Sequence, residues 1–398
     1  MFQSLERLSP DAILGLMASF RADSFSQKVD LGVGVYRDEQ GHTPVLEAVR
    51  RAERLVIESQ DTKSYVAAAG REEYNRAVEA LVLGPAHGAL RDGRVRTLQA
   101  PGGCGALRVG AELIRAAAPS TVAHVSDPTW ANHVPLLGSS GLALQRYPYY
   151  DVTAHRLRFE AMLEHLTAAR RGDVVLVHAS CHNPCGADLS LDQWRLLGER
   201  LERGGLVPFL DIAYQGLGSD LETDAAGVRL LTERLPEALV AVSGSKNLGL
   251  YRERLGALIV VSDSPSRADA AMSHMLQIAR SIYSMPPDHG AAIAARILTE
   301  EPLRRLWTEE LARMQQRLAG MRALLAAELR TATGEDTFDF IAAQHGMFSM
   351  LGVSPEAVRA LRERHHIYLM LDGRFNIAGI TQENAAQVAR AVAAERQR

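Results

Sequence analysis

Short apolar runs alternate with amphipathic stretches through the middle of the chain. Five runs consist mainly of valine, leucine, isoleucine and alanine, and they occupy Thr121–Ser126, Val174–Ala179, Val207–Ile212, Leu239–Ser243 and Ala257–Val261. Continuous apolar runs of this length are typical of strands that are covered on both faces. Helical stretches such as Leu191–Arg203 separate the runs. The pattern therefore predicts an α/β fold in which helices cover both faces of a mostly parallel sheet.

The periodicity changes after Pro302. Apolar residues from Leu303 to Leu329 recur at spacings of one, three and four, which predicts one long amphipathic helix that ends near Gly334. The short segments FDFIAAQ, GMFSMLG, HIYLML and FNIAG follow, and a last helix is expected from Gln382. A long helix with such a tail predicts a second, smaller α+β domain. Periodicity alone does not place the N-terminal segment.

The composition is typical of a globular protein, because 47% of the 398 residues are hydrophobic and 23% are charged. The net charge of −3 shows no basic excess, so neither a nucleic acid nor an anionic membrane is an expected partner. No apolar run approaches the roughly 18 residues of a membrane span, and the first residues lack the pattern of a secretory signal. The three cysteines, Cys104, Cys181 and Cys185, favour a reducing compartment, which we expect to be the cytoplasm. They predict neither a disulfide framework nor a metal site.

A glycine-rich segment, Pro101–Gly105, precedes the helical sequence ALRVGAELIRAAA. Glycines let backbone amides approach a ligand, and a helix N-terminus favours anions, so a phosphate site is one interpretation of this segment. An ordinary loop before a helix is the other. The segment fits neither the Walker loop nor the dinucleotide-binding fingerprint.

Two further segments follow predicted strands, at the end of an α/β sheet where ligands bind. Ser180–Gly186 contains an Asn-Pro turn, and Asn183 could either donate to a ligand or serve only the turn. Asp211 and Tyr214 lie at the end of LVPFLDIAY. A carboxylate at the end of a buried strand needs a partner. Asp211 is therefore interpreted either as the partner of a protonated ring nitrogen or as a helix N-cap.

Lys246 also follows a predicted strand, in the sequence SGSKN. Desolvation lowers the pKa of a lysine and makes its amine a nucleophile for a carbonyl, whereas the alternative is a solvated surface lysine. Ser243 and Arg254 could join the phosphate site. Two distant arginines, Arg280 and Arg374, could each bind a carboxylate through two parallel hydrogen bonds, although a single arginine is more often solvated.

Taken together, a phosphate cradle, an aspartate and a lysine at strand ends, and carboxylate-binding arginines are what a pyridoxal phosphate enzyme requires. The chain resembles the class I aminotransferases among the fold-type I pyridoxal-phosphate enzymes, and within them the aspartate/aromatic-amino-acid subgroup. The resemblance covers essentially the whole chain. It is carried by SGSKNLGLYRERLGAL and SCHNPCGADLSLDQW, its most specific blocks, and by DLGVGVYRDEQGHTPVLEAV, APGGCGALRVGAEL, VSDPTWANH, LDIAYQGLG, RSIYSMPPDHGA, QHGMFSM and GRFNIAG.

The resemblance implies a large domain with a mostly parallel seven-stranded sheet sandwiched by helices, plus a smaller α+β domain. The expected boundaries are residues 1–36 for an N-terminal arm and part of the small domain, and 37–301 for the large cofactor-binding domain. Residues 302–398 are expected to form a long linking helix and the C-terminal small domain. The family also implies a homodimer with shared active sites.

The resemblance also assigns residues around the ring of pyridoxal 5′-phosphate. It makes Lys246 the Schiff-base lysine and Asp211 the acid that pairs with the pyridine nitrogen, with His133 as a supporting histidine behind that acid. Tyr214 and Asn183 match the partners of the cofactor's phenolic oxygen.

The remaining implied roles concern the phosphate and the substrate. The phosphate is expected to bind at Gly103, Cys104, Ser243 and Arg254, with Tyr65 reaching it from the partner subunit. The residues implied to bind substrate are Gly34, Trp130, Asn183, Arg280 and Arg374. Of these, Gly34 and Arg374 hold the α-carboxylate, Trp130 also stacks on the cofactor ring, and Arg280 crosses the dimer to grip a side-chain carboxylate.

The implied activity transfers the amino group of L-aspartate, aromatic L-amino acids or both to 2-oxoglutarate, in two half-reactions through pyridoxamine phosphate. The products are a keto acid and L-glutamate. Cys104 replaces a hydroxyl residue that is common in the phosphate cup, and the apolar Met285 follows Ser284. These departures leave open an enzyme specialised for an aromatic or modified aromatic amino acid. A lyase or decarboxylase on the same fold, and a non-catalytic ligand-sensing module, are the more remote alternatives.

Overall fold

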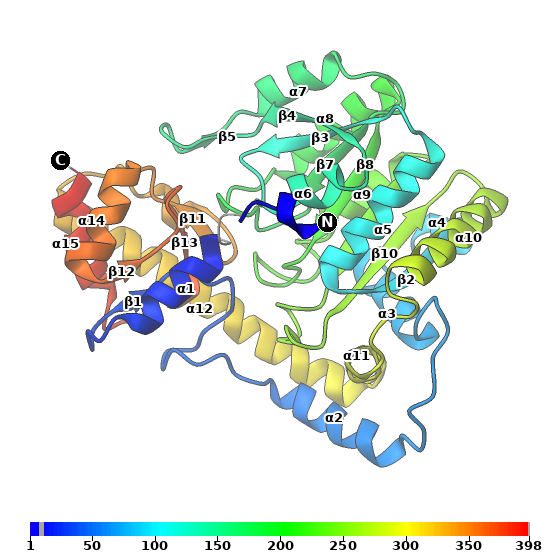
Figure 1. Ribbon diagram of the computed structural model, residues 1–398, viewed down its shortest axis with the longest axis horizontal. Coiled ribbons are helices and arrows are strands. Elements are labelled where there is room, and N and C mark those ends of the chain that lie inside the picture. Colours follow the sequence, from blue (N-terminus) through cyan, green and yellow to red (C-terminus); the bar gives the residue numbers. More distant parts are fainter. Residues whose placement is uncertain (8–11, 397–398) are drawn as a thin grey trace.

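A seven-stranded sheet forms the centre of the larger part of the molecule (Figure 1). The computed structural model describes residues 1–7 and 12–396. The strand order is β2-β10-β9-β8-β7-β3-β4. The bounds are β2 Val95–Pro101, β3 Val122–Asp127, β4 Ala143–Pro148, β7 Val174–His178, β8 Val207–Ile212, β9 Ala238–Ser243 and β10 Leu255–Val261. β10 is antiparallel to both neighbours and the other neighbouring pairs are parallel, so the prediction of a mostly parallel sheet is confirmed.

The two faces of the sheet explain why its strands have continuous apolar sequences. In β7, Val174 and Leu176 belong to one buried cluster, whereas Val175 and Val177 belong to a second one. Successive side chains of a strand point to opposite faces, so each cluster lies on its own side of the sheet. The first cluster includes side chains of α5 (Gly102–Ala117) and α10 (Pro265–Ile282). The second includes side chains of α3 (Glu72–Val82), α7 (Phe159–Thr167), α8 (Leu191–Gly204), α9 (Ala226–Arg234) and α11 (His289–Thr299).

The five predicted strands are present as β3, β7, β8, β9 and β10, but the apolar pattern does not predict β2 or β4. β4 lies at one edge of the sheet, and Ala143, Gln145 and Arg146 are exposed. β2 lies at the other edge and interrupts its apolar residues with Thr97 and Gln99. An exposed edge strand such as β4 needs no apolar side chains on both faces, so it gives a weaker pattern. In β2 the run is instead interrupted by two polar residues that are buried.

The predicted helix over 191–203 is α8, and local hydrogen bonds fix both of its ends. The Ser190 hydroxyl accepts from the Gln193 amide, and the Gln193 side chain accepts from the Ser190 amide, which forms a capping box. Gly205 ends the helix in the left-handed conformation, with φ of 61°.

One long helix, α12 (Glu301–Thr333), connects the sheet region with the C-terminal part of the molecule (Figure 1). It confirms the predicted long helix, and Gly334 ends it with φ of 72°. Along its length it packs against α2 (Glu47–Ser59), α11, α13 (Phe340–Ala343) and α15 (Ala385–Arg396). Its buried side chains include Trp307, Leu311 and Leu325.

The N-terminal segment, which periodicity could not place, pairs with the C-terminal tail. β1 (Val29–Asp30) runs parallel to β12 (Ile367–Tyr368), and β11 (Phe348–Met350) runs antiparallel to β13 (Arg374–Asn376). The last helix begins at Ala385 rather than at Gln382, because Thr381 and Asn384 cap one another's backbone amides in the preceding turn. The domain boundaries remain a prediction.

The other elements are short or lie at the surface. They are η1 (Phe2–Ser4), α1 (Ala12–Ala22), α4 (Gly88–Arg91), α6 (His133–Gly138), β5 (Tyr150–Asp151), β6 (Arg156–Leu157), α14 (Pro355–His365) and η2 (Ile377–Gly379). Within residues 1–7 and 12–396, no helix combines the length and the apolar character needed to cross a membrane.

Candidate active site

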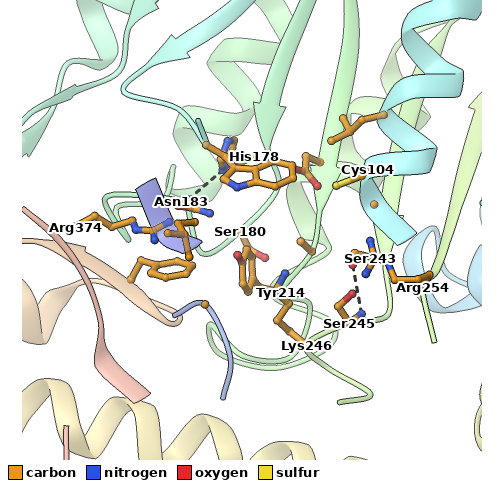
Figure 2. A pocket seen from close by; sticks show the side chains of 18 residues that line it. Cys104, His178, Ser180, Asn183, Tyr214, Ser243, Ser245, Lys246, Arg254 and Arg374 are labelled. Carbon is orange, nitrogen blue, oxygen red and sulfur yellow. Dashed lines mark hydrogen bonds between the residues drawn. The ribbon is translucent and has the colours of Figure 1, made fainter. Parts of the chain in front are cut away.

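A cavity of about 290 Å³ opens at the carboxyl ends of the parallel strands. Figure 2 shows Arg374 at one end of it, Ser243 and Arg254 at the other, and Lys246 and Tyr214 between them. The predicted site residues that line this cavity are Gly34, Gly103, Cys104, Trp130, Asn183, Asp211, Tyr214, Ser243, Lys246, Arg254 and Arg374. The structure therefore brings together residues, such as Gly34 and Arg374, that are more than 300 positions apart in the sequence.

The N-terminus of α5 forms one end of the cavity. Gly102 has φ of 73°, and a Cβ there would lie 2.5 Å from an Arg254 guanidinium nitrogen, so the arginine lies directly against this glycine. Ser243 ends β9, and its hydroxyl accepts from the Ser245 amide at 3.3 Å. Cys104 receives a weak hydrogen bond from Asn132 at 3.7 Å. Backbone amides at a helix start, an arginine and a serine together suit an anion such as phosphate.

Lys246 is partly buried in the loop after β9, so a solvated surface lysine is the wrong interpretation. Its Nζ lies 5.3 Å from the centre of the Tyr214 ring. Burial lowers the pKa of Lys246, although the nearby Asp211 carboxylate opposes this effect. A lowered pKa increases the fraction of neutral amine, which is the nucleophilic form.

Asp211 lies inside β8 and is buried, and no helix begins next to it among the described residues, so the N-cap interpretation is wrong. Its Oδ2 accepts from His133 Nε2 at 3.0 Å. Burial acts to raise the pKa of this carboxyl, but the hydrogen bond from His133 and the electrostatic effect of the His133, His178 and Lys246 side chains outweigh burial and lower it. A buried carboxylate that stays ionised can hold a proton on a ring nitrogen.

A chain of hydrogen bonds continues behind Asp211. His133 Nδ1 lies 2.8 Å from the Thr129 hydroxyl, which lies 3.4 Å from His178 Nε2. His178 Nδ1 accepts from the Asn183 amide at 3.1 Å. Burial lowers the pKa of His178 to about 3, so this imidazole is neutral at ordinary pH. The position of His133 behind Asp211 agrees with the expectation from the resemblance.

Two residues in the middle of the cavity have buried oxygen atoms without hydrogen bonds to the described part of the chain. The buried Asn183 Oδ1 and Ser180 Oγ have no hydrogen-bond partner among the described residues. Buried polar atoms are normally satisfied, so unsatisfied ones beside a cavity indicate a ligand. Burial, together with the Asp211 charge, raises the pKa of the Tyr214 phenol, which therefore remains a hydrogen-bond donor.

Arg374 forms the other end of the cavity from strand β13, and only 7% of it is exposed. It donates to the Gly32 carbonyl at 3.1 Å and lies 4.7 Å from the centre of the Phe348 ring. No carboxylate in residues 1–7 and 12–396 forms an ion pair with it. A buried, unpaired guanidinium facing a cavity suits a carboxylate of a ligand. Gly34 leaves room beside it, because a Cβ there would lie 3.0 Å from Phe348.

The structure does not bring two predicted residues to this cavity. Tyr65 is 89% exposed, and Arg280 is exposed on α10, where it donates to the Ser284 hydroxyl. Neither residue lines the cavity of its own chain. Their contribution from a partner subunit stays a prediction.

Several cavity residues were not found from the sequence, namely Ile13, Leu107, His178, Ser180, Ala213, Ser245 and Phe348. His178 had a signal that could have identified it, because it ends β7 and pairs in register with Asp211 of β8. A histidine opposite a buried carboxylate is a candidate partner of it. The apolar residues carry no such signal, since their sequence pattern is that of any core residue. In the described part of the chain, no group of three or more histidine, cysteine, aspartate or glutamate side chains could hold a metal ion.

Comparison with known proteins agrees with this arrangement. The model of the family "Aminotransferase class I and II" matches residues 26–392. An aromatic-amino-acid aminotransferase of Paracoccus denitrificans is 44% identical over 98% of this chain and 99% of its own length. An aspartate aminotransferase of Escherichia coli is 42% identical over 99% of this chain and 100% of its own length.

Solved structures agree as well. An aromatic-amino-acid aminotransferase of Burkholderia pseudomallei, covalently bound to pyridoxal phosphate, has a TM-score of 0.97 at 41% identity, with 100% of this chain and 99% of that chain covered. An aromatic amino acid aminotransferase with 3-indolebutyric acid has a TM-score of 0.96 at 44% identity, with 99% and 100% covered. Because the family model matches nearly the whole chain and these relatives are more than 40% identical to it, the chain belongs to the class I and II aminotransferase family.

Proposed function

We propose that this aminotransferase uses pyridoxal 5′-phosphate to transfer the amino group of L-aspartate, an aromatic L-amino acid or both to 2-oxoglutarate. The observation that carries the proposal is one cavity in which Lys246 and Asp211 lie between an anion-binding end and the unpaired Arg374. The cofactor phosphate needs an anion-binding end, the carboxylate of the amino acid needs an arginine at the other end, and the reaction needs a base and an acid between them. Relatives with either donor in their names are similar to the chain to nearly the same degree.

The residues present fit the cofactor. Gly103, Cys104, Ser243 and Arg254 would hold its phosphate, and Trp130 would cover one face of its ring. Asp211 would keep the pyridine nitrogen protonated. The buried Asn183, whose Oδ1 has no hydrogen-bond partner among the described residues, would contact polar atoms of the cofactor. When bound, pyridoxal phosphate supplies an aldehyde that accepts the amino group and a ring that withdraws electrons from the substrate α-carbon.

The chain's own residues move the proton and orient the substrate. Lys246 Nζ, with its lowered pKa, takes the proton from the substrate α-carbon and acts as general base and then as general acid. Arg374 holds the α-carboxylate beside Gly34, which fixes the direction of the bond that must break. Tyr214, whose phenol stays protonated because its pKa is raised, would donate a hydrogen bond to the cofactor's phenolic oxygen.

The remaining parts of the proposal concern assembly. Two copies form a homodimer in which Tyr65 reaches the partner's phosphate site and Arg280 grips the side-chain carboxylate of a dicarboxylic substrate. The exposure of both side chains supports this role. The domain division at residues 36/37 and 301/302 and a cytoplasmic location belong to the same proposal.

A single-turnover titration tests the donor. The purified aldehyde-form enzyme is mixed separately with aspartate, tyrosine, phenylalanine and glutamate, and the absorbance of the cofactor is followed. For each donor, the maximal rate constant is divided by the dissociation constant. A ratio that is much larger for aspartate than for the other donors indicates an aspartate aminotransferase. Tyrosine or phenylalanine equal or ahead indicates an aromatic aminotransferase, with Met285 as the first residue to change. No absorbance change with any donor contradicts the proposal, and release of ammonia or carbon dioxide without an acceptor indicates a lyase or decarboxylase.

A further inference from the structure

Tyr65 and Arg280 lie on two exposed segments that are far apart in the sequence. Tyr65 belongs to the loop between α2 and α3, and Arg280 lies near the end of α10. Both side chains are exposed, and neither lines the cavity of its own chain. The direction in which each side chain leaves the surface therefore depends on what holds the two segments from below.

One buried side chain contacts both segments. Gln99 lies in the edge strand β2 and has no exposed surface. Its amide oxygen accepts from the backbone N–H of Arg71 at 2.9 Å, and its amide nitrogen donates to the carbonyl of Pro287 at 2.7 Å. Arg71 follows Tyr65 by one short loop, and Pro287 follows Arg280 in the same way.

The backbone of Gln99 is also hydrogen-bonded to both the Tyr65 segment and the Arg280 segment. Its N–H donates to the Ala69 carbonyl at 3.0 Å, and its carbonyl accepts a longer hydrogen bond from the Tyr283 hydroxyl at 3.5 Å. All four polar groups of this residue are thus used by the Tyr65 segment and the Arg280 segment.

Close packing and an ion pair leave little freedom around this junction. Gly70 has φ of 83°, and a Cβ on it would lie 2.3 Å from Gln99 Cβ, so the Tyr65 segment lies directly on Gln99. Arg71 donates through two guanidinium nitrogens to both oxygens of Asp288, at 3.0 and 2.9 Å. Such a forked, partly buried pair has a defined geometry. It joins the two segments a second time, beside Gln99.

We infer that Gln99 is a positioning residue that sets Tyr65 and Arg280 together for the active site of the partner subunit. This inference rests on the proposed function, in which those two residues act across the dimer. Gln99 thereby links two properties that otherwise have separate causes. These are the affinity for the cofactor phosphate and the preference for dicarboxylic over aromatic substrates.

The test compares the holoenzyme with Gln99→Leu, which puts a shorter, uncharged apolar side chain in place of the amide and removes both side-chain hydrogen bonds. We expect the dissociation constant of pyridoxal phosphate to rise about tenfold. With saturating cofactor, kcat/KM for aspartate should fall about tenfold or more, because a misplacement of about 1 Å can cost up to about 100-fold. The value for phenylalanine should stay within about threefold, because this substrate has no side-chain carboxylate for Arg280 to bind. The cofactor affinity is measured by absorbance titration of the apoenzyme and does not depend on activity.

A second variant separates the two connections. Gln99→Glu keeps an acceptor for the Arg71 amide but loses the donor to Pro287. It should therefore lower kcat/KM for aspartate relative to phenylalanine and keep the cofactor affinity within about threefold. Gln315→Leu is the matched control, because Gln315 is half-buried on α12, donates to the Gly218 carbonyl at 3.0 Å and lies outside both segments. It should leave both properties at the wild-type level.

Two benchmark variants distinguish failure of this inference from failure of the proposed function. Tyr65→Phe should weaken only cofactor binding, and Arg280→Leu should reduce only the use of aspartate. If both benchmarks behave so and Gln99→Leu forms a folded dimer with wild-type cofactor affinity and an unchanged ratio of aspartate to phenylalanine, the positioning role is overturned. If the benchmarks change neither property, the assignment of Tyr65 and Arg280 fails, and the role of Gln99 fails with it.

Discussion

The two ends of the cavity are built in different ways. The cofactor end consists of loops and helix starts that follow strands of one sheet, and Asp211, His133 and His178 there are buried and joined by hydrogen bonds. The carboxylate end is made by Gly34 and by Arg374 of a short two-stranded sheet outside that framework. The first end is fixed by the core of the large sheet, whereas the second depends on contacts between the N-terminal and C-terminal segments. This difference predicts that chemistry and substrate binding can be changed separately.

The sharpest test of the cofactor end is Lys246→Ala. Removal of the amine should reduce multiple turnover on the order of 10⁴-fold or more, because both the nucleophile and the general base are lost. Turnover is measured with aspartate and 2-oxoglutarate, and far-ultraviolet circular dichroism checks that the variant is folded. Near-native multiple turnover would show that the assignment of this lysine is wrong.

The corresponding test of the carboxylate end is Arg374→Lys. A lysine keeps the charge but loses the planar fork, so kcat/KM should fall about 100-fold, mostly through a higher KM. The affinity for pyridoxal phosphate should stay at the wild-type level, since Arg374 lies at the far end of the cavity from Ser243 and Arg254. Arg330→Lys, on the exposed side of α12, serves as the control. A fall in cofactor affinity equal to the fall in kcat/KM would contradict the separation of the two ends.

The buried histidines predict a smaller effect, on stability. The pKa of His178 is about 3 in the folded chain, whereas an unfolded histidine has a pKa of about 6.5. Between these values the unfolded state binds a proton that the native state does not, so stability is lost as the pH falls from 6.5 towards 3. The contribution of His178 is about 1.4 kcal/mol per pH unit.

Urea unfolding of the wild type and of His178→Asn at pH 7, 6 and 5 measures this effect. Asn keeps an acceptor for the Asn183 amide but does not titrate, so the variant should lose less stability per pH unit than the wild type. Equal pH dependence of the two proteins would show that His178 is not held neutral by the fold.

The smallest predicted effect is that of Cys104→Thr. A thiol is a weak donor, and a hydroxyl in its place would add one hydrogen bond to the phosphate. The affinity for pyridoxal phosphate should therefore increase about three- to tenfold, as measured by titration of the apoenzyme. Cys104→Ala is the paired variant and should bind no more tightly than the wild type. A tighter alanine variant would mean that the size of the side chain, rather than its donor, limits binding.

The sequence predicted the strands that lie inside the sheet, because burial on both faces produces continuous apolar runs. It did not predict β4, whose exposed edge position allows Gln145 and Arg146. It predicted most polar residues of the cavity as candidates but missed His178, Ser180 and Ser245. The choice between Asp211 as a helix cap and as a buried carboxylate needed the position of β8. Phe348 and Leu107 could not be found, since an apolar side chain at a cavity has the same pattern as one in the core.

The N-terminal segment shows a second limit. The pairing of β1 with β12 joins residues more than 300 positions apart, and both strands contain only two residues. No local pattern marks so short a strand. The position of Gly34 beside Arg374 follows from that pairing and therefore could be inferred only from the resemblance.

The hydrogen-bond chain behind Asp211 has a fixed direction. The backbone N–H of Asn183 can only donate, so His178 Nδ1 must accept and its proton lies on Nε2, which points to Thr129. The proton of the Thr129 hydroxyl is thereby left free for His133 Nδ1, and His133 Nε2 donates to Asp211. Because this hydrogen-bond chain ends at a peptide amide, it cannot release protons to solvent or take them up from it. Asp211 therefore does not exchange protons with bulk water along this path. Its negative charge can act as a fixed electrostatic partner rather than as a proton carrier.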